Sequence, residues 1–459
     1  MKIETPQYTR ELVEFLHALA PADLPAEALD RARYFLLDFL AVAVRGSREE
    51  SAAAVQRMVE KAGGQGCASV IGTPIRTLPG LAAVANGAAS HSIEQDDTHG
   101  GGSIHLGATM YPVALALAEM RPETPAAEIL TAVVAGYEAA ARVAMAAQAK
   151  EQYALGFHPT ATCGVFGAAV TASKLLGLTA EQTLAAVGTA GSMAAGSMAF
   201  LADGAWTKRI HPGLAAQNGI HAAMLAAEGF TGPRRILEGR DGFLRSHSRR
   251  PIPERLTADL GESFEILHTA VKPHACCRYM QGPIDGILAI VREHHVRPAQ
   301  VRQIEVAVLE AGWEIVAEPR KQKYHPASIV DAQFSMPFGA AVAVIHGAAG
   351  LEQFTEEQID SPRVQKMMGR VVLIKDFRLE ETFPREWPAR VAIQLEDGHS
   401  YEKFIRYPKG DPENPLTWEE MTAKFRSLAG AVLSPERCGE IIAGVKSEKL
   451  AALPRLCVP

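Results

Sequence analysis

The sequence predicts a mainly α-helical protein, with a large all-helical domain and a smaller α+β domain. Its 459 residues are too many for one hydrophobic core of ordinary size, so two domains are expected. Alanine-rich runs and an aromatic content of 6% favour close-packed helices over a β-sandwich. The alternation of apolar and polar residues that indicates strands begins only near residue 263. We therefore place the helical domain at 1–262 and an α+β lid domain at 263–411, and expect 412–459 to pack back on the helical domain.

Apolar side chains recur at helical spacing through most of the first domain. A first helical region covers residues 5–45, with Thr5-Pro6 or Thr9 at its start. Thr179 followed by Gln182 is a capping box, which indicates the start of another helix. Two stretches, 156–164 and 200–212, are predicted to be loops. Further helices are expected at 51–62, 79–90, 110–120, 125–148, 165–176 and 213–228.

Residues 183–202 carry no charge, and their number is enough to span a bilayer. They are mainly Ala, Gly, Ser and Met, with little Leu, Ile or Phe. Small residues let helices approach closely, so this stretch is interpreted as a buried helix or helix pair inside a bundle. A single membrane span is the less favoured alternative.

The second domain is predicted from strand patterns interrupted by helices. Asp397-Gly398 lies between two alternating runs, which is a strong hairpin signal, and the return strand is expected near 401–405. The other expected strands are 264–271, 301–308, 371–376 and 390–395. Helices are expected at 281–295 and 331–346, and the chain reads as helical again from Thr417.

Charge and cysteine content limit the classes of partner and compartment. The net charge of −6 gives no basic excess of the kind that nucleic-acid binding requires. None of the six cysteines forms a C-x-x-C pair, which argues against zinc-ribbon and thioredoxin-like sites. The N-terminus shows no apolar signal region. Reduced thiols in a cytoplasmic protein, without a membrane or nucleic-acid partner, are therefore expected.

One polar stretch, residues 91–105, lies between two alanine-rich segments that read as buried helix. It holds His91, Glu94, Asp96, Asp97, His99 and His105, together with a glycine triplet. Acids beside an apolar run need partners, because an unpaired buried charge is costly. We interpret the stretch as an acid–base and orienting cluster. A loop with helix caps is the alternative, and a metal site is a weaker one because no standard ligand spacing is present.

The cations that would complete such a site lie far along the chain. His158 precedes a predicted helix, and Lys208-Arg209 precede another, where positive charge opposes the helix dipole. Lys272 and Arg278 fall at the predicted domain junction, where ligand sites tend to occur. Arginine can grip a carboxylate with two hydrogen bonds, and lysine acts as a point charge. Read alone, these segments are also compatible with a capping loop, a solvated pair and a polar hinge.

Taken together, these motifs resemble the MmgE/PrpD family, which includes 2-methylcitrate dehydratases, cis-aconitate decarboxylases and iminodisuccinate epimerases. The resemblance runs in order from about residue 5 to about residue 405. It rests on His91-x4-Asp96-Asp97-Thr98, Gly156-Phe-His158, Asp203-Gly-Ala-x2-Lys208-Arg209 with Gly213-x-Ala215-Ala216, Lys272-Pro-x3-Cys277-Arg278 and Asp331-Ala-x-Phe-Ser335.

The resemblance implies a large helical domain, a smaller α+β domain, a homodimer and a pocket between the domains. It implies no iron–sulfur cluster and no organic cofactor. By motif match, the pocket residues are Asp96, His105, His158, Lys208 and Lys272. Two positions depart from the family pattern. Glu94 stands where members commonly have Asp, and Cys277 stands near a His of the decarboxylases, which counts against decarboxylation.

We therefore expect a cofactor-independent lyase that moves a proton next to a carboxylate of a small polycarboxylic acid, with 2-methylcitrate dehydration as the first hypothesis. His158 is assigned as the acid–base residue and His105 as its partner, and fixed cations stabilise the anion that develops. Lys208, Lys272 and Arg278 hold carboxylates, and Asp96 orients a cation. Arg209, His91, Glu94 and Tyr324 complete the expected substrate-binding set. An epimerase, a decarboxylase and a non-catalytic binding protein stay open as alternatives.

Overall fold

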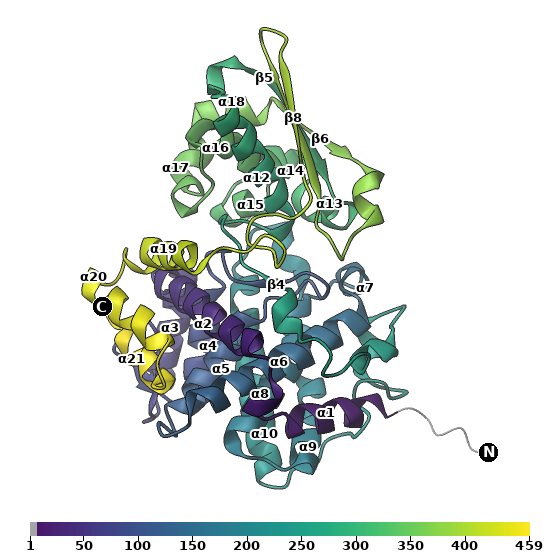
Figure 1. The fold of residues 1–459 in the computed structure, drawn as a ribbon, viewed down its shortest axis with the longest axis vertical. Coiled ribbons are helices and arrows are strands. Elements are labelled where there is room, and N and C mark those ends of the chain that lie inside the picture. The colour runs from purple at the N-terminus through teal and green to yellow at the C-terminus, as the bar shows by residue number, and fades with distance from the viewer. Residues whose placement is uncertain (1–6) are drawn as a thin grey trace, which may run out of the picture.

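The computed structural model describes residues 7–459 and has two lobes stacked along its long axis (Figure 1). The larger lobe is mostly helical and is called the helical lobe. The smaller lobe carries a four-stranded sheet with helices around it and is called the sheet lobe. The predicted fold class, mainly α with a smaller mixed domain, is confirmed. The predicted helix start at Thr5-Pro6 lies outside the described residues.

The helical lobe is organised around α4, α5, α6, α8 and α10, which pack against one another. Glycines let two of these helices touch backbone to backbone: a Cβ on Gly87 of α4 would lie 2.5 Å from Cα of Gly213 in α10. The helices of this lobe are α1 (Tyr8–Ala18), α2 (Ala26–Gly46), α3 (Glu50–Ala62), α4 (Pro79–Ser90), α5 (Gly107–Ala118), α6 (Ala126–Ala147), α7 (Ala149–Ala154), α8 (Pro159–Leu176), α9 (Ala180–Ala190), α10 (Thr207–Ala227) and α11 (Phe243–His247).

Of the three C-terminal helices, the first two lie against α2 of the helical lobe and the third packs against the second. They are α19 (Trp418–Ala429), α20 (Pro435–Val445) and α21 (Leu453–Leu456). Met421 and Phe425 of α19 belong to the same hydrophobic core as α2. Lys424 of α19 donates to Asp38 at 2.6 Å and to the carbonyl of Gln95 at 2.8 Å. The helix α19 is therefore hydrogen-bonded to the polar stretch, through Lys424 and the backbone of Gln95.

The sheet lobe has the strand order β6-β5-β7-β8, with β5 and β6 parallel and the other neighbours antiparallel. The strands are β5 (Val301–Val308), β6 (Val371–Lys375), β7 (Ala389–Leu395) and β8 (Ser400–Ile405), so the predicted strand at 301–308 and the Asp397-Gly398 hairpin are confirmed. The helices are α12 (Arg278–Glu293), α13 (Glu310–Val316), α14 (Arg320–Tyr324), α15 (Ile329–Gln333), α16 (Met336–His346), α17 (Glu356–Asp360) and α18 (Pro362–Met368).

Two predicted loops are partly helical. The helix α8 begins at Pro159, because proline suits the first helical position, and His158 is its N-cap residue. The helix α10 begins at Thr207, so Lys208 and Arg209 lie in its first turn. Both corrections extend the helices towards the polar residues that precede them.

Three other predictions were wrong in detail. Residues 264–271 form a 3₁₀ turn, Glu265–His268, and only the two-residue strand β4 (Thr269–Ala270), because the Glu265 N–H donates to the Glu138 carboxylate rather than to a neighbouring strand. The helix expected at 331–346 is broken, since the Ser335 side chain caps α16. Residues 191–199 follow α9 as an irregular segment that is partly exposed, not as a buried helix.

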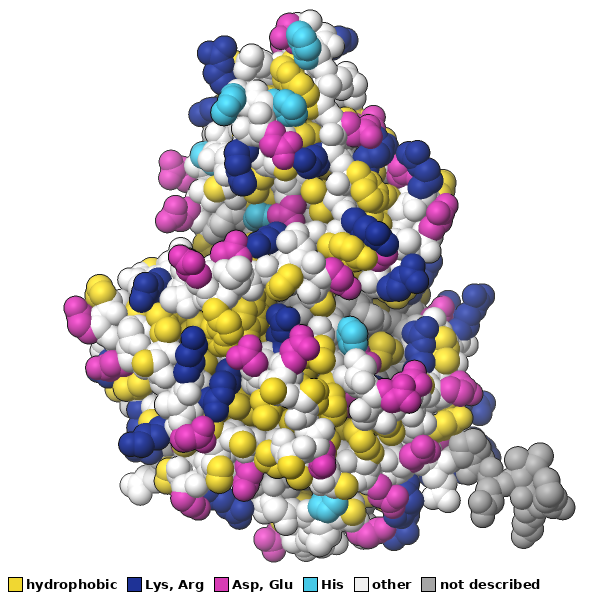
Figure 2. Space-filling view, viewed as in Figure 1, with side chains coloured by type: hydrophobic (Ala, Val, Ile, Leu, Met, Phe, Trp, Pro, Cys, Tyr) yellow, Lys and Arg dark blue, Asp and Glu magenta, His cyan; other side chains and the backbone are white. Residues whose placement is uncertain are grey.

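The helix α6 is long and apolar enough to cross a membrane, but 94% of its most apolar window is buried inside the protein. That burial is typical of the central helix of a folded core. On the face seen in Figure 2, acidic and basic side chains are interspersed over both lobes, and neither sign forms a continuous patch there.

Candidate active site

The polar stretch lies at the junction of the two lobes and is almost wholly buried. It begins where α4 ends, at His91. The short strand β3 (Thr98–His99) then pairs with β4, with Thr98 opposite Ala270. This pairing carries Lys272, two residues after β4, next to the acids of the stretch. The structure thereby joins two segments that are far apart in the sequence.

Three imidazole rings converge at this junction. The ring centroid of His91 lies 4.8 Å from that of His105 and 6.0 Å from that of His158. The Nδ1 atom of each ring has a partner: Asp96 Oδ2 at 2.6 Å for His91, the Asp97 carbonyl at 2.8 Å for His105, and His211 Nδ1 at 3.0 Å for His158. Because Nδ1 is occupied in each case, Nε2 is the ring nitrogen left to meet a ligand.

Two lysines and two acids form a buried ionic network beside these rings. Lys208 pairs with one oxygen of Glu94, and Lys272 Nζ lies 3.4 Å from the other. Lys272 also lies 3.4 Å from Asp96 Oδ1. Glu94 has a φ of +57°, a left-handed conformation that is uncommon for a residue with a side chain. Strain of this kind is found at functional sites, where neighbouring contacts enforce it.

Burial and neighbouring charge set the protonation of the network. Burial alone raises the pKa of the Glu94 carboxyl, but Lys208 and Lys272 hold it well below its usual range. Burial also opposes charge on Asp96, yet the hydrogen bond from His91 and the Lys272 ammonium keep its pKa well below normal. The acids are therefore ionised. Burial lowers the pKa of Lys208, whereas burial is outweighed at Lys272 by Asp96 and Glu94, which raise its pKa.

The imidazoles behave in the opposite way. Burial lowers the pKa of His105 to about 3 and that of His211 to about 4. Burial, and after it the His211 ring, also lowers the pKa of His158. The rings are therefore uncharged at neutral pH when the site is empty.

Some of these groups line a small pocket. Its volume is about 30 Å³, far below the roughly 300–1,000 Å³ of an ordinary small-ligand pocket. One part of its wall is polar, with Glu94, Thr98, His105, His158 and Lys208. The other part is largely apolar and aromatic, with Met198, Phe200, Ile315, Phe334, Tyr153, Tyr279 and the Cys277 thiol. A polycarboxylate therefore fits only if this pocket widens.

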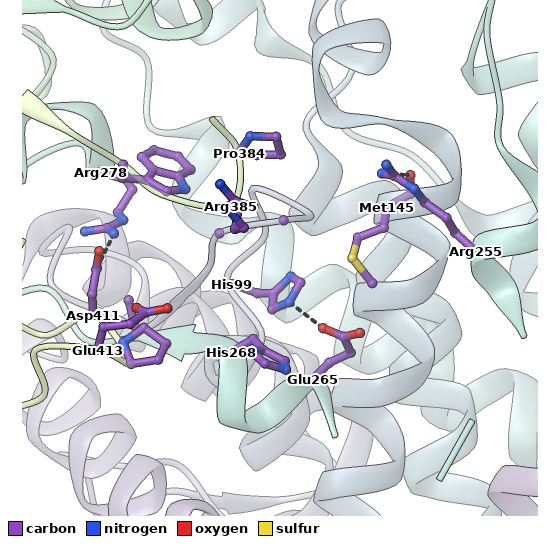
Figure 3. Close-up of a pocket in the computed structure, with 15 residues that line it drawn as sticks. His99, Met145, Arg255, Glu265, His268, Arg278, Pro384, Arg385, Asp411 and Glu413 are labelled. Atoms are coloured by element: carbon purple, nitrogen blue, oxygen red, sulfur yellow. Dashed lines mark hydrogen bonds and ion pairs between the residues drawn. The ribbon is translucent and has the colours of Figure 1, made fainter. Parts of the chain in front are cut away.

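Arg278 lines both this pocket and a larger cleft at the lobe junction. Figure 3 shows the larger cleft, with Arg278 in its wall. The cleft has a volume of about 470 Å³ and is lined from both lobes. Arg278 pairs with Asp411 and stacks over Trp387, with 4.9 Å between Cζ and the ring centroid. Its Nε and Nη1 are buried and have no hydrogen-bond partner among residues 7–459. Unmade hydrogen bonds of this kind leave donors that a substrate carboxylate can use.

Five predicted site residues do not line the pocket. Three of them lie directly behind its wall, where they contact Glu94 or His105: His91, Asp96 and Lys272. The other two point elsewhere. The Tyr324 hydroxyl donates to the carbonyl of Val371 in β6 at 2.7 Å, because α14 turns that side chain onto the sheet. Arg209 follows Lys208 directly, so it points to another side of α10, where its Nη1 donates to Ser51 Oγ at 3.0 Å. Glu49 lies 4.0 Å from the same nitrogen. Both assignments are corrected: neither side chain lines the pocket.

Other residues of the site were not assigned from the sequence. His211 lies one turn after Lys208 on α10 and touches His158. Tyr153 closes the pocket, and its hydroxyl lies 2.8 Å from Ser103 Oγ. The only sequence signal for His211 was its place three residues after Lys208, which puts both on one helix face once the helix is known to begin at Thr207.

The three imidazoles also meet part of the requirement for a metal. One ring nitrogen of each of His91, His105 and His158 lies within 4.8 Å of the others. Tetrahedral zinc at a bond length of about 2.0–2.1 Å would require these nitrogens to come closer. The adjacent Lys208 ammonium opposes a divalent cation as well. The arrangement suits an anion better than it suits a metal.

Comparisons with known proteins agree with this architecture. The MmgE/PrpD N-terminal domain matches residues 10–255, and the MmgE/PrpD C-terminal domain matches residues 274–448. The chain is 29% identical to the cis-aconitate decarboxylase-like protein oryM of Aspergillus oryzae, over 97% of this chain and 95% of that protein. It is 27% identical to a cis-aconitate decarboxylase of Aspergillus terreus, over 94% and 91% of the two chains. It is 28% identical to the cis-aconitate decarboxylase of Homo sapiens, over 96% and 91%.

The two family domains together cover nearly the whole chain, one on each side of the junction where the histidines and lysines meet. This protein belongs to the MmgE/PrpD family.

Proposed function

We propose that this protein is a lyase that acts on a small tricarboxylic acid of the cis-aconitate class and releases one carboxyl group as carbon dioxide. The observation that carries the proposal is the pocket itself, in which two imidazoles and the Lys208 ammonium face an apolar wall. The relatives named above support the reaction type, because each match extends over more than nine-tenths of both chains.

The chemistry requires one proton and no redox partner. In a β,γ-unsaturated acid, the bond from the saturated carbon to the carboxylate breaks, and its electron pair forms a new double bond. The π electrons of the original double bond form a new C–H bond at its far carbon, with a proton that the enzyme supplies. A carboxylate pressed against the wall of Phe200 and Phe334 is poorly solvated, whereas neutral carbon dioxide is not penalised there.

Lys208 and Lys272 are suited to hold the carboxylates that remain, and Arg278 offers unpaired N–H groups at the mouth of the pocket. His158 is the best-placed proton donor, because its ring lines the pocket and lies between His91 and His211. His105 is the second candidate, with its ring centroid 6.4 Å from that of His158.

The fixed charges of the site explain how an imidazole proton donor acquires its proton. Three cations, Lys208, Lys272 and Arg278, are already matched by three carboxylates, those of Glu94, Asp96 and Asp411. A substrate with two or three negative charges therefore enters a site with no positive charge to spare. Its charge raises the pKa of the nearby imidazoles. Substrate binding then takes up protons and creates the imidazolium acid that the reaction uses.

A second candidate is the dehydration of a 2-methylcitrate-like acid. It is favoured by the presence of two imidazoles, His105 and His158, which can serve as base and acid on the same substrate. The thiol of Cys277, where an imidazole would have favoured decarboxylation, is the sequence feature that keeps this candidate open.

One assay separates the candidates. The purified protein is incubated with cis-aconitate, citrate and 2-methylcitrate, and carbon dioxide release and enoate absorbance are followed. Decarboxylation releases carbon dioxide from cis-aconitate, whereas dehydration forms an enoate from 2-methylcitrate without gas. Deuterium incorporation from heavy water with neither change indicates epimerisation. No change with any of these acids, or with iminodisuccinate, rejects the proposal.

A further inference from the structure

His158 differs from the other two pocket histidines in its partner. The Nδ1 atom of His91 faces the carboxylate of Asp96, and that of His105 faces a backbone carbonyl. The Nδ1 atom of His158 instead lies 3.0 Å from Nδ1 of another histidine, His211. Both rings are buried, with exposed fractions of 3% for His158 and 6% for His211.

Two facing Nδ1 atoms at this distance share one proton. Two N–H groups would repel each other, and two lone pairs would leave no hydrogen bond. If His158 carries the shared proton, its Nε2 presents a lone pair to the pocket and acts as a base. If His211 carries it, the neutral His158 has its proton on Nε2 and acts as an acid.

We infer that His211 is a positioning residue that sets the protonation of His158 Nε2 and lets it change between donor and acceptor during turnover. A carboxylate partner would hold Nδ1–H in place and fix one tautomer, as Asp96 does for His91. A second imidazole can either give or accept the proton. This inference rests on the proposed function, since it concerns the acid–base residue of that reaction.

Within residues 7–459, the surroundings of the pair contain one ammonium group and two further imidazoles, but no carboxylate in contact with either ring. Lys208 faces it from α10, and His91 and His105 face it from the polar stretch. The Phe200 ring packs against both histidines, with centroids 6.4 Å from His158 and 6.5 Å from His211. The backbone N–H of His158 donates to the Gly196 carbonyl at 3.0 Å, which fixes the entry to α8. The pair is therefore held in place while its proton stays free to move.

The first test uses two substitutions and a matched control. His211→Asn keeps a polar group near Nδ1 but cannot pass a proton on, and His211→Phe removes the hydrogen bond. The control is His221→Phe, on the exposed face of the same helix. We expect His211→Asn to lower kcat about a hundredfold, the low end of a general acid–base contribution, with KM nearly unchanged.

The pH profile separates this role from simple packing. The His211 ring lowers the pKa of His158. Replacing His211 should therefore move the limb of the kcat/KM pH profile that reports His158 towards higher pH. The His221→Phe control should keep both the rate and the profile. If His211→Asn retains the wild-type kcat and the wild-type limb, the inference is overturned. Thermal unfolding of each variant shows whether the fold is intact, and Asn suffices if the Phe variant does not fold.

A second measurement does not depend on turnover. In protein with ¹⁵N-labelled histidine and no substrate, a shared Nδ1 proton gives a strongly downfield NMR signal coupled to two rings. We expect this signal in the wild type and in His221→Phe, and its loss in His211→Phe. If the acids above are turned over but no shared proton is seen, the inference fails and the proposed function stands. If the proton is seen but no acid reacts, the proposed function fails.

Discussion

Lys272 Nζ lies 3.4 Å from Glu94 Oε2, and the other oxygen of that carboxylate is bound by Lys208. One acid thus joins a helix of the helical lobe to the segment that leads into the sheet lobe. All three side chains are buried. Removing one partner from such a network leaves an uncompensated charge away from water, which is costly.

The first prediction concerns this network. Lys272→Met should destabilise the protein by about 3–5 kcal/mol, because Glu94 and Asp96 both lose a partner. Lys208→Met should cost less, since Lys208 pairs with Glu94 alone among these acids. Urea unfolding measures both. The double variant Lys208→Met/Glu94→Gln should recover part of the unfolding free energy that Lys208→Met loses. If the double variant loses more unfolding free energy than the two single variants added together, the pairing is contradicted.

The second prediction concerns proton uptake on binding. The affinity for a tricarboxylate should rise as the pH falls from about 8 to about 6, because His105 and His158 are neutral in the empty site and gain protons beside the anion. Titration calorimetry in two buffers of different ionisation enthalpy gives the number of protons taken up. A binding heat that is independent of the buffer would show that no proton is taken up.

The third prediction concerns Asp97, whose carboxylate accepts from the Tyr137 hydroxyl and the Gly107 N–H. Burial raises its pKa to about 8, above the roughly 3.9 of an unfolded chain. A raised folded-state pKa gives stability that is full below about pH 4 and is lost as the pH rises through about 8. Asp97→Asn has no such proton to lose. Relative to the wild type, this variant should therefore gain stability progressively between about pH 4 and about pH 8 in urea unfolding.

The fourth prediction concerns the mouth of the pocket. Arg278→Lys should raise KM for a tricarboxylate about tenfold or more, because lysine cannot reproduce the forked guanidinium contact. Asp411→Asn, which leaves Arg278 in place but removes its ionic partner, should lower KM instead. Steady-state kinetics on both variants decides the matter. A lower KM in Arg278→Lys would remove this arginine from substrate binding.

The sequence predicted which charges belong together better than it predicted where helices begin. The need for partners identified Glu94 and Asp96 with Lys208 and Lys272, because buried acids are rarely left unpaired. Tyr324 was placed wrongly, since its direction depends on how α14 lies on the sheet, which no local pattern encodes.

His211 shows a different limit. Residues 200–212 read as a loop because glycine and proline punctuate them, and within a loop the spacing between Lys208 and His211 carries no information. Only the helix that begins at Thr207 puts both side chains on the same face, beside His158. Helix boundaries are the least certain part of a pattern-based prediction, and here the site is built on them.

The contact between Gly87 and Gly213 fixes how far apart His91 and Lys208 can be, because α4 delivers the first and α10 the second. A methyl group at either glycine would push these helices apart and so move His91 away from Lys208. Inactivating mutations are therefore to be sought in the alanine-rich scaffold, at positions that no ligand ever touches.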